Sequence, residues 1–150
     1  MPSHRGHQKR LEKKKKQRTA ARAAMRAPAS PTSLNGIVRL AAAAPFGQAF
    51  MSDSWRSEEP ELVTVVLTRA LADGSIVAGT ALVDRTCLGV KDAFARHLRS
   101  RTELEDLLEA AGAAHEQPLE EVSVVEAQSV VYHAIDYARS LGFEPHRDFP

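Results

Sequence analysis

Two stretches in the middle of the chain are rich in Val, Ile, Leu and Thr and predict β-strands. They run from Leu62 to Arg69 and from Ser75 to Asp84, and Asp73-Gly74 lies between them as a turn signal. The two stretches therefore predict an antiparallel hairpin. Because apolar residues fall on both faces of each strand, we expect the sheet to be covered on more than one side.

Apolar residues at helical spacing predict helices before and after this hairpin. Leu34 to Ala44 is expected to form a short core-facing helix, with Pro45 as its end. Val90, Phe94 and Leu98 are expected to share one face of a second helix. The segment Phe46 to Arg56 is ambiguous, and we expect its large apolar residues to be buried: Phe50, Met51 and Trp55.

Two capping boxes predict the helices of the C-terminal half. Thr102-Glu103-Leu104-Glu105 begins a helix that buries leucines and stops at Gly112. A polar loop follows through Gln117-Pro118. Ser123-Val124-Val125-Glu126 begins the longest helix, whose apolar positions keep a period of 3.6 until Gly142 ends it.

These elements predict a single α+β domain over residues 34–150. We expect a short antiparallel sheet, built on the hairpin at residues 62–84, packed against three to four helices. The single cysteine, Cys87, excludes an internal disulfide, and no apolar run approaches 18 residues. The N-terminus also lacks the apolar core of a secretion signal. We therefore expect a cytoplasmic protein with no membrane partner.

The formal net charge of +1 conceals a strong asymmetry along the chain. Residues 1–27 hold ten basic residues and one acid, a net charge of +9, whereas the other 123 residues carry a net charge of −8. Residues 1–27 have good helix formers but almost no apolar face, so we expect a disordered or fraying basic arm. Residues 28–33 contain two prolines and are predicted to form a linker.

The basic arm is the first candidate site, because its charge density matches a segment that lies along a phosphate backbone. It has no aromatic residue for stacking on bases, so base-specific recognition is not implied. RNA, and ribosomal RNA in particular, is the expected partner ahead of DNA, and the alternative is a solvated tail. The candidate nucleic-acid contacts are Arg5, Lys9, Arg10, Lys13, Lys14, Lys15, Lys16, Arg18, Arg22 and Arg26.

The second candidate site is the segment that follows the second predicted strand. Asp84 at the strand end, with Lys91 and Asp92 in the first turn of the expected helix, could form a metal or phosphate site. The structural alternative is that Asp84 caps a turn and that Cys87 is a small buried residue.

Two further groups of polar residues lie in the C-terminal part. Glu126, Ser129, His133, Asp136 and Ser140 recur at steps of three and four along the longest helix. We favour a solvated helix face for this polar stripe over a cation site. In the tail, His146 and Asp148 could join Asp84 or Asp92 in space and complete an acidic metal cluster.

Two segments of the chain resemble a family of bacterial proteins that has no assigned activity. They are Cys87-Leu88-Gly89-Val90-Lys91-Asp92-Ala93-Phe94 and Tyr137-Ala138-Arg139-Ser140-Leu141-Gly142-Phe143-Glu144-Pro145-His146-Arg147-Asp148-Phe149. The resemblance implies a bacterial, cytosolic setting and a shared fold. It carries no catalytic residues to this chain.

The sequence leaves three functional hypotheses, and it does not establish whether the protein is an enzyme. The leading one is a non-enzymatic nucleic-acid-associated protein, linked to RNA or the ribosome, that needs no cofactor. The alternative is a phosphodiesterase or nuclease that depends on Mg²⁺ held by Asp84, Asp92 and Asp148, with Lys91 or His146 assisting at the phosphate. A third is an interaction module of a toxin–antitoxin or defence system.

Overall fold

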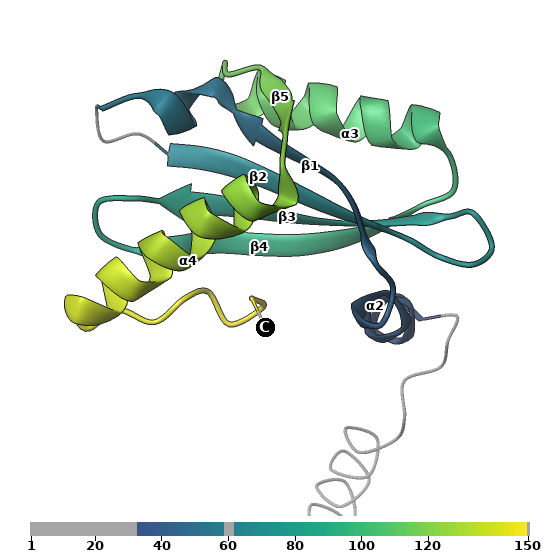
Figure 1. Cartoon of the computed structure of the whole chain (residues 1–150), viewed down its shortest axis with the longest axis horizontal. Helices are drawn as coiled ribbons and strands as arrows, with labels where there is room; N and C mark the ends of the chain where they lie inside the picture. Colours follow the sequence, from purple (N-terminus) through teal and green to yellow (C-terminus); the bar gives the residue numbers. More distant parts are fainter. Residues whose placement is uncertain (1–32, 59–61, 150) are drawn as a thin grey trace, which may run out of the picture. The chain divides into compact units, whose positions relative to one another are not determined.

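An antiparallel sheet of five strands organises the part of the chain that the computed structural model describes, residues 33–58 and 62–149 (Figure 1). The strands lie in the order β4-β3-β2-β1-β5. Their bounds are Phe46–Ser52 (β1), Leu62–Ala70 (β2), Ile76–Asp84 (β3), Gly89–Leu98 (β4) and Leu119–Val122 (β5). All of them belong to one compact unit, Pro31–Pro150.

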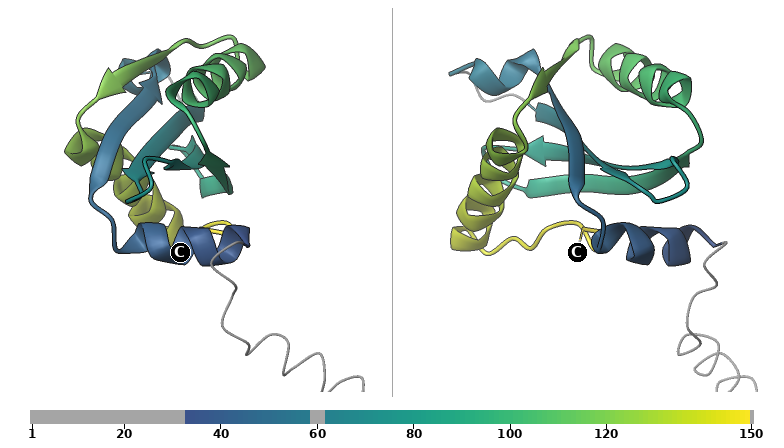
Figure 2. Two further views of the ribbon diagram at one scale, coloured as in Figure 1. Left: turned by 90° about the vertical axis from the view of Figure 1, so that its right-hand side faces the viewer. Right: turned by 45° about the vertical axis from the view of Figure 1, so that its right-hand side comes forward.

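Helices cover both faces of this sheet. They are α2 (Leu34–Ala42), α3 (Arg101–Ala114) and α4 (Val124–Ser140), and a 3-10 turn, η1, spans Asp53–Arg56. Figure 2 shows α3 on one side of the sheet and α2 and α4 on the other. The α+β class and the antiparallel sheet are therefore as the sequence predicts, although five strands make the sheet larger than the expected one.

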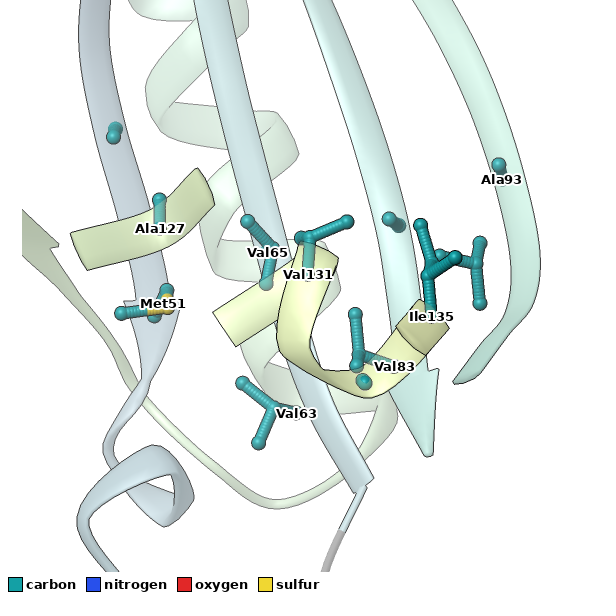
Figure 3. Packing of buried hydrophobic residues seen from close by; sticks show 12 residues of the cluster. Met51, Val63, Val65, Val83, Ala93, Ala127, Val131 and Ile135 are labelled. Carbon is teal, nitrogen blue, oxygen red and sulfur yellow. The ribbon is translucent and has the colours of Figure 1, made fainter. Parts of the chain in front are cut away.

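The two helical layers create two hydrophobic cores, because neighbouring residues of a strand point to opposite faces. Val65 of β2 packs in the cluster beneath α4, with Val131 and Ile135 of that helix (Figure 3). The next residue, Val66, packs in the cluster beneath α3, with Leu104 and Leu107. This explains why both faces of the predicted strands are apolar.

The predicted hairpin is confirmed. β2 and β3 pair without interruption from Leu62↔Asp84 to Ala70↔Ile76. Asp73 organises the turn, because its Oδ1 accepts hydrogen bonds from the backbone N–H of Ser75 at 2.9 Å and from its hydroxyl at 2.6 Å.

The helix that we predicted over Val90, Phe94 and Leu98 is wrong, because the segment is strand β4. A spacing of four residues keeps side chains on one face in a helix and also in a strand, so this pattern does not separate the two. The strand also contains an irregularity beside Leu82 and Val83 of β3. It places Val90 in the core beneath α4, while Leu98 lies in the core beneath α3.

One shorter prediction also needs correction, and two segments without a clear prediction form strands. Most of α2 is not core-facing, since only Gly36 and Ala41 are buried in it. The ambiguous segment after it forms β1 and η1, where Phe50 and Met51 are buried as expected and Trp55 is half-buried. Strand β5 follows the polar loop directly, and its four residues carry too weak an alternating pattern for the sequence to predict it.

The sequence predicts the N-terminal cap of α4 correctly but places the N-terminus of α3 too late. Ser123 and Glu126 form the predicted capping box at the start of α4. Helix α3 begins two residues earlier than expected, because Ser100 accepts a hydrogen bond from the N–H of Glu103. It also continues past Gly112, which is buried within it. Within the described residues, no helix has both the length and the apolar character that crossing a bilayer requires.

Candidate functional site

Asp84 ends β3 and organises the turn that leads into β4. Its Oδ1 accepts hydrogen bonds from the N–H of Thr86 at 2.9 Å, the Thr86 hydroxyl at 2.7 Å and the N–H of Cys87 at 3.1 Å. Partial burial raises the pKa of Asp84, but these hydrogen bonds together lower it below its ordinary value of 3.8. The carboxylate thus has a turn-capping role, which is the structural alternative that the sequence left open, and Cys87 is half-buried.

Three of the other predicted site residues do converge. His146 Nε2 lies 3.9 Å from Asp92 Oδ1, and His146 Nδ1 lies 3.9 Å from Asp148 Oδ2. The tail reaches this position because the N–H of His146 donates a hydrogen bond to the carbonyl of Val90 at 2.8 Å. Both carboxylates are more than half exposed, and the imidazole between them is about one-third exposed. The result is a solvent-facing carboxylate–imidazole–carboxylate group at the β4 edge.

Lys91 and Asp92 do not occupy a first helical turn, as the sequence predicted, because both are exposed residues of strand β4. The geometry gives no contact between Asp84 and the group around His146. No set of three or more His, Cys, Asp or Glu side chains in residues 33–58 and 62–149 has an arrangement that could hold a metal ion.

The polar stripe on α4 is exposed at Ser129, His133 and Asp136. Glu126 belongs to the capping box, where the hydroxyl and the N–H of Ser123 donate to its carboxylate and lower its pKa. Ser140 donates its hydroxyl proton to the carbonyl of Tyr137 at 2.6 Å. These contacts are those of a solvated helix face.

The candidate nucleic-acid contacts of the arm lie outside the described residues, so only the arginines of the folded body can be placed. Arg101 pairs with Glu105 at 3.4 Å and donates a hydrogen bond to Gln48 Oε1 at 2.6 Å. Arg96 lies over the ring of Phe94, with its guanidinium carbon 5.9 Å from the ring centroid. The exposed face of α3 adds acids beside them: Glu103, Glu105, Asp106 and Glu109.

The described region also contains a cleft that the sequence pattern does not predict. It lies on the α2 and α4 side of the sheet and has a volume of about 670 Å³. Its floor comes from β2, β3 and β4, and its walls come from α2, α4 and the C-terminal tail. The residues with polar side chains among those that line it include Asn35, Arg69, Gln128, Tyr132 and Asp148.

The sequence does contain a signal for this cleft. Gly79 stands in the middle of a strand that is otherwise rich in β-branched and aliphatic residues, and a glycine there often marks a place where something approaches the backbone closely. Gly79 is exposed although β3 is an inner strand, because nothing from α2 or α4 covers it.

Comparison of the chain with models of protein families, with curated proteins and with solved structures gave no match.

Proposed function

We propose that the chain is a non-enzymatic nucleic-acid-associated protein, linked to RNA or the ribosome, whose basic arm makes the contact. The observation that carries the proposal is the division of charge, with +9 over residues 1–27 and −8 over the rest. A polycation of this density gains affinity for a phosphate backbone by releasing counterions, whatever the nucleotide sequence.

The charges of the folded body support assigning that contact to the arm alone. The sequence allowed a basic face around Arg96, Arg99 and Arg101. Arg101, however, is paired with Glu105, and the acids of α3 share the same region of the surface. An acidic surface repels phosphate within about one Debye length, roughly 8 Å at physiological salt. We therefore expect the body to face away from the nucleic acid or to select a further partner.

Salt dependence tests this proposal in the full chain. The variant in which Lys13, Lys14, Lys15 and Lys16 are all changed to Gln removes four of the ten basic residues of the arm. Each lost phosphate contact changes the slope of log K against log salt by about 0.7 to 0.9, so the slope should become shallower by about 3. Fluorescence anisotropy with a labelled ribosomal RNA fragment, and with a DNA duplex of equal length, measures both slopes.

The matched control is the double variant Arg96→Gln and Arg99→Gln, which removes positive charge from the body. We expect it to leave the slope unchanged. If the body variant weakens binding as much as the arm variant, the contact does not belong to the arm. If neither variant changes the affinity, the polyanion proposal fails.

The metal-dependent phosphodiesterase is the second candidate, and the position of His146 between Asp92 and Asp148 is the observation in its favour. In that reading the imidazole would serve as acid or base, and one of the two carboxylates would hold Mg²⁺ together with phosphate oxygens of the substrate. Magnesium-dependent RNA cleavage should then disappear in both Asp92→Asn and His146→Gln, while cleavage that persists in both variants excludes this group as its source.

An interaction module of a toxin–antitoxin or defence system stays a third hypothesis. The identity of the neighbouring genes would test it.

A further inference from the structure

The cleft between α2, α4 and the sheet has the size of a small-molecule site. Its volume of about 670 Å³ falls within the range of about 300 to 1,000 Å³ that ligand pockets occupy. The floor is apolar: Val65 and Leu67 of β2 lie beside Gly79 and Ala81 of β3, and these in turn pair with Ala95 and Ala93 of β4.

The hollow exists because four neighbouring floor positions have almost no side chain. Gly79 pairs with Ala95, and Ala81 pairs with Ala93, so two adjacent cross-strand pairs are both small. A Cβ atom built on Gly79 would approach only one atom within 4 Å, the carbonyl oxygen of Leu67 at 3.9 Å. Space above Gly79 is therefore open, in a position where a protein interior is normally close-packed.

The rim of the cleft exposes apolar surface that the described residues leave uncovered. Leu34 and Val38 of α2, Phe46 of β1 and Tyr132 of α4 are all exposed and all line the cleft. Contiguous apolar surface of this kind, with a few polar groups at its edge, is typical of a binding site.

Arg69 gives the cleft its charge. Its guanidinium lies over the ring of Phe46 at 3.7 Å and donates a hydrogen bond to the carbonyl oxygen of Ala44. These two contacts orient the guanidinium, and among the described residues its other N–H groups have no hydrogen-bond acceptor. Arg69 makes no ion pair within the described residues.

Asp148, the acidic residue that lines the cleft, lies beside basic side chains, in contrast to Arg69. Asp148 lies 3.9 Å from His146 Nδ1 and 3.9 Å from Arg147 Nε. Among the described residues that line the cleft, Arg69 is therefore the charged side chain without an ion-pair partner. It is held at the edge of an apolar floor, where a carboxylate would form charge-assisted, two-pronged hydrogen bonds with the guanidinium.

We propose that this cleft binds a small carboxylic acid with an aliphatic or aromatic body, in which Arg69 holds the carboxylate and the floor around Gly79 receives the apolar part. The proposal does not depend on the basic arm, so its outcome is separate from that of nucleic-acid binding. A floor of glycine and alanine leaves room for the flat or extended apolar part of such an acid. Because the guanidinium is already oriented, less entropy is lost when it binds the carboxylate.

Three probes of equal chain length test the proposal on the full chain: octanoate, 1-octanol and octylammonium. Titration followed by amide chemical shifts in NMR spectra gives each dissociation constant and the residues affected. We expect octanoate to bind at least about tenfold more tightly than the alcohol or the amine, because only octanoate can pair with Arg69. Equal binding of all three would overturn the role of Arg69, and binding of none would overturn the site.

Two kinds of variant distinguish the contribution of the ligand's carboxylate to binding from that of its apolar part. Arg69→Gln should lower the affinity for octanoate to that of octanol, whereas Arg96→Gln should change nothing. Arg96 is the matched control, because it also stacks on an aromatic ring, that of Phe94 at 5.9 Å, but does not line the cleft. If both arginine variants weaken octanoate binding equally, the attraction is a general effect of charge and the proposal is wrong.

Gly79→Val fills the floor and should weaken binding of octanoate and octanol alike, by about tenfold or more. Gly79 does not have a positive φ, so the fold should accept valine without backbone strain. Ala95→Leu also places a larger side chain in the floor of the cleft. If it does not weaken binding of octanoate, the result counts against the site in the same way.

A second copy of the chain is the other possible occupant of the cleft, and sedimentation velocity tests it. A dimer that Gly79→Val dissociates would mean that a second copy fills the cleft, and would overturn the small-acid proposal.

Discussion

Gly89 of β4 packs closely against α4, the helix that forms one wall of the cleft, and its substitution tests this contact. Gly89 has a φ of +67°, and a Cβ atom there would lie 3.0 Å from Ala138 Cβ and 3.1 Å from the carbonyl oxygen of Ala134. Alanine at this position therefore meets two separate penalties. The left-handed backbone costs about 1 to 2 kcal/mol, and the crowding against α4 costs about 1 to 3 kcal/mol.

We expect Gly89→Ala to lower the free energy of unfolding by about 2 to 5 kcal/mol in total. Gly74→Ala is the matched control, because Gly74 has a φ of +83° but has no atom within 4 Å of the added Cβ. Its cost should be the backbone part alone, about 1 to 2 kcal/mol. Urea denaturation followed by circular dichroism measures both values, and their difference isolates the contact with α4.

Asparagine sharpens the comparison, because its side chain tolerates the left-handed region better than alanine does. Gly74→Asn should recover most of the stability that Gly74→Ala loses, whereas Gly89→Asn should recover little, since the crowding remains. If Gly89→Ala costs no more than Gly74→Ala, the reasoning that α4 packs tightly against this glycine is refuted. Such a result would leave the positive φ as the structural reason for Gly89.

The remaining predictions concern caps, core and pH. Ser123→Ala should cost about 1 kcal/mol in urea denaturation, because the cap of α4 is lost. Leu104→Ala should cost about 2 to 5 kcal/mol, because Leu104 is only 1% exposed. The pKa of Asp84 is lower in the folded state, so its stabilisation is present above the ordinary value of 3.8 and is lost as the pH falls through the lowered value. The difference in Tm between wild type and Asp84→Asn should therefore shrink from about pH 7 to about pH 2; a constant difference would contradict this assignment.

The local signals in the sequence predict those parts of the fold whose structure depends on nearby residues. The β2–β3 hairpin follows from two β-branched runs around Asp73-Gly74, and the start of α4 follows from the box of Ser123 and Glu126. Both rest on hydrogen bonds between residues a few positions apart, which a sequence pattern encodes directly.

Strand β4 and the candidate sites are different, because they depend on contacts between distant parts of the chain. The apolar spacing at Phe94 and Leu98 suits a helix or a strand, and pairing with β3 decides the choice. His146 meets Asp92 because the tail returns to β4 at Val90, whereas Asp84 accepts its hydrogen bonds within the turn that it caps.

By itself, the sequence determined the charge division between residues 1–27 and the rest, the α+β class and the central hairpin. Only the tertiary structure decided that Gly79 and its small neighbours form the floor of a cleft and that Arg69 stands at its edge without a carboxylate partner in the described region. The physical reason is that charge and local hydrogen bonds depend on adjacent residues. A cleft, and an arginine without an ion-pair partner, depend instead on which residues from distant parts of the chain pack nearby.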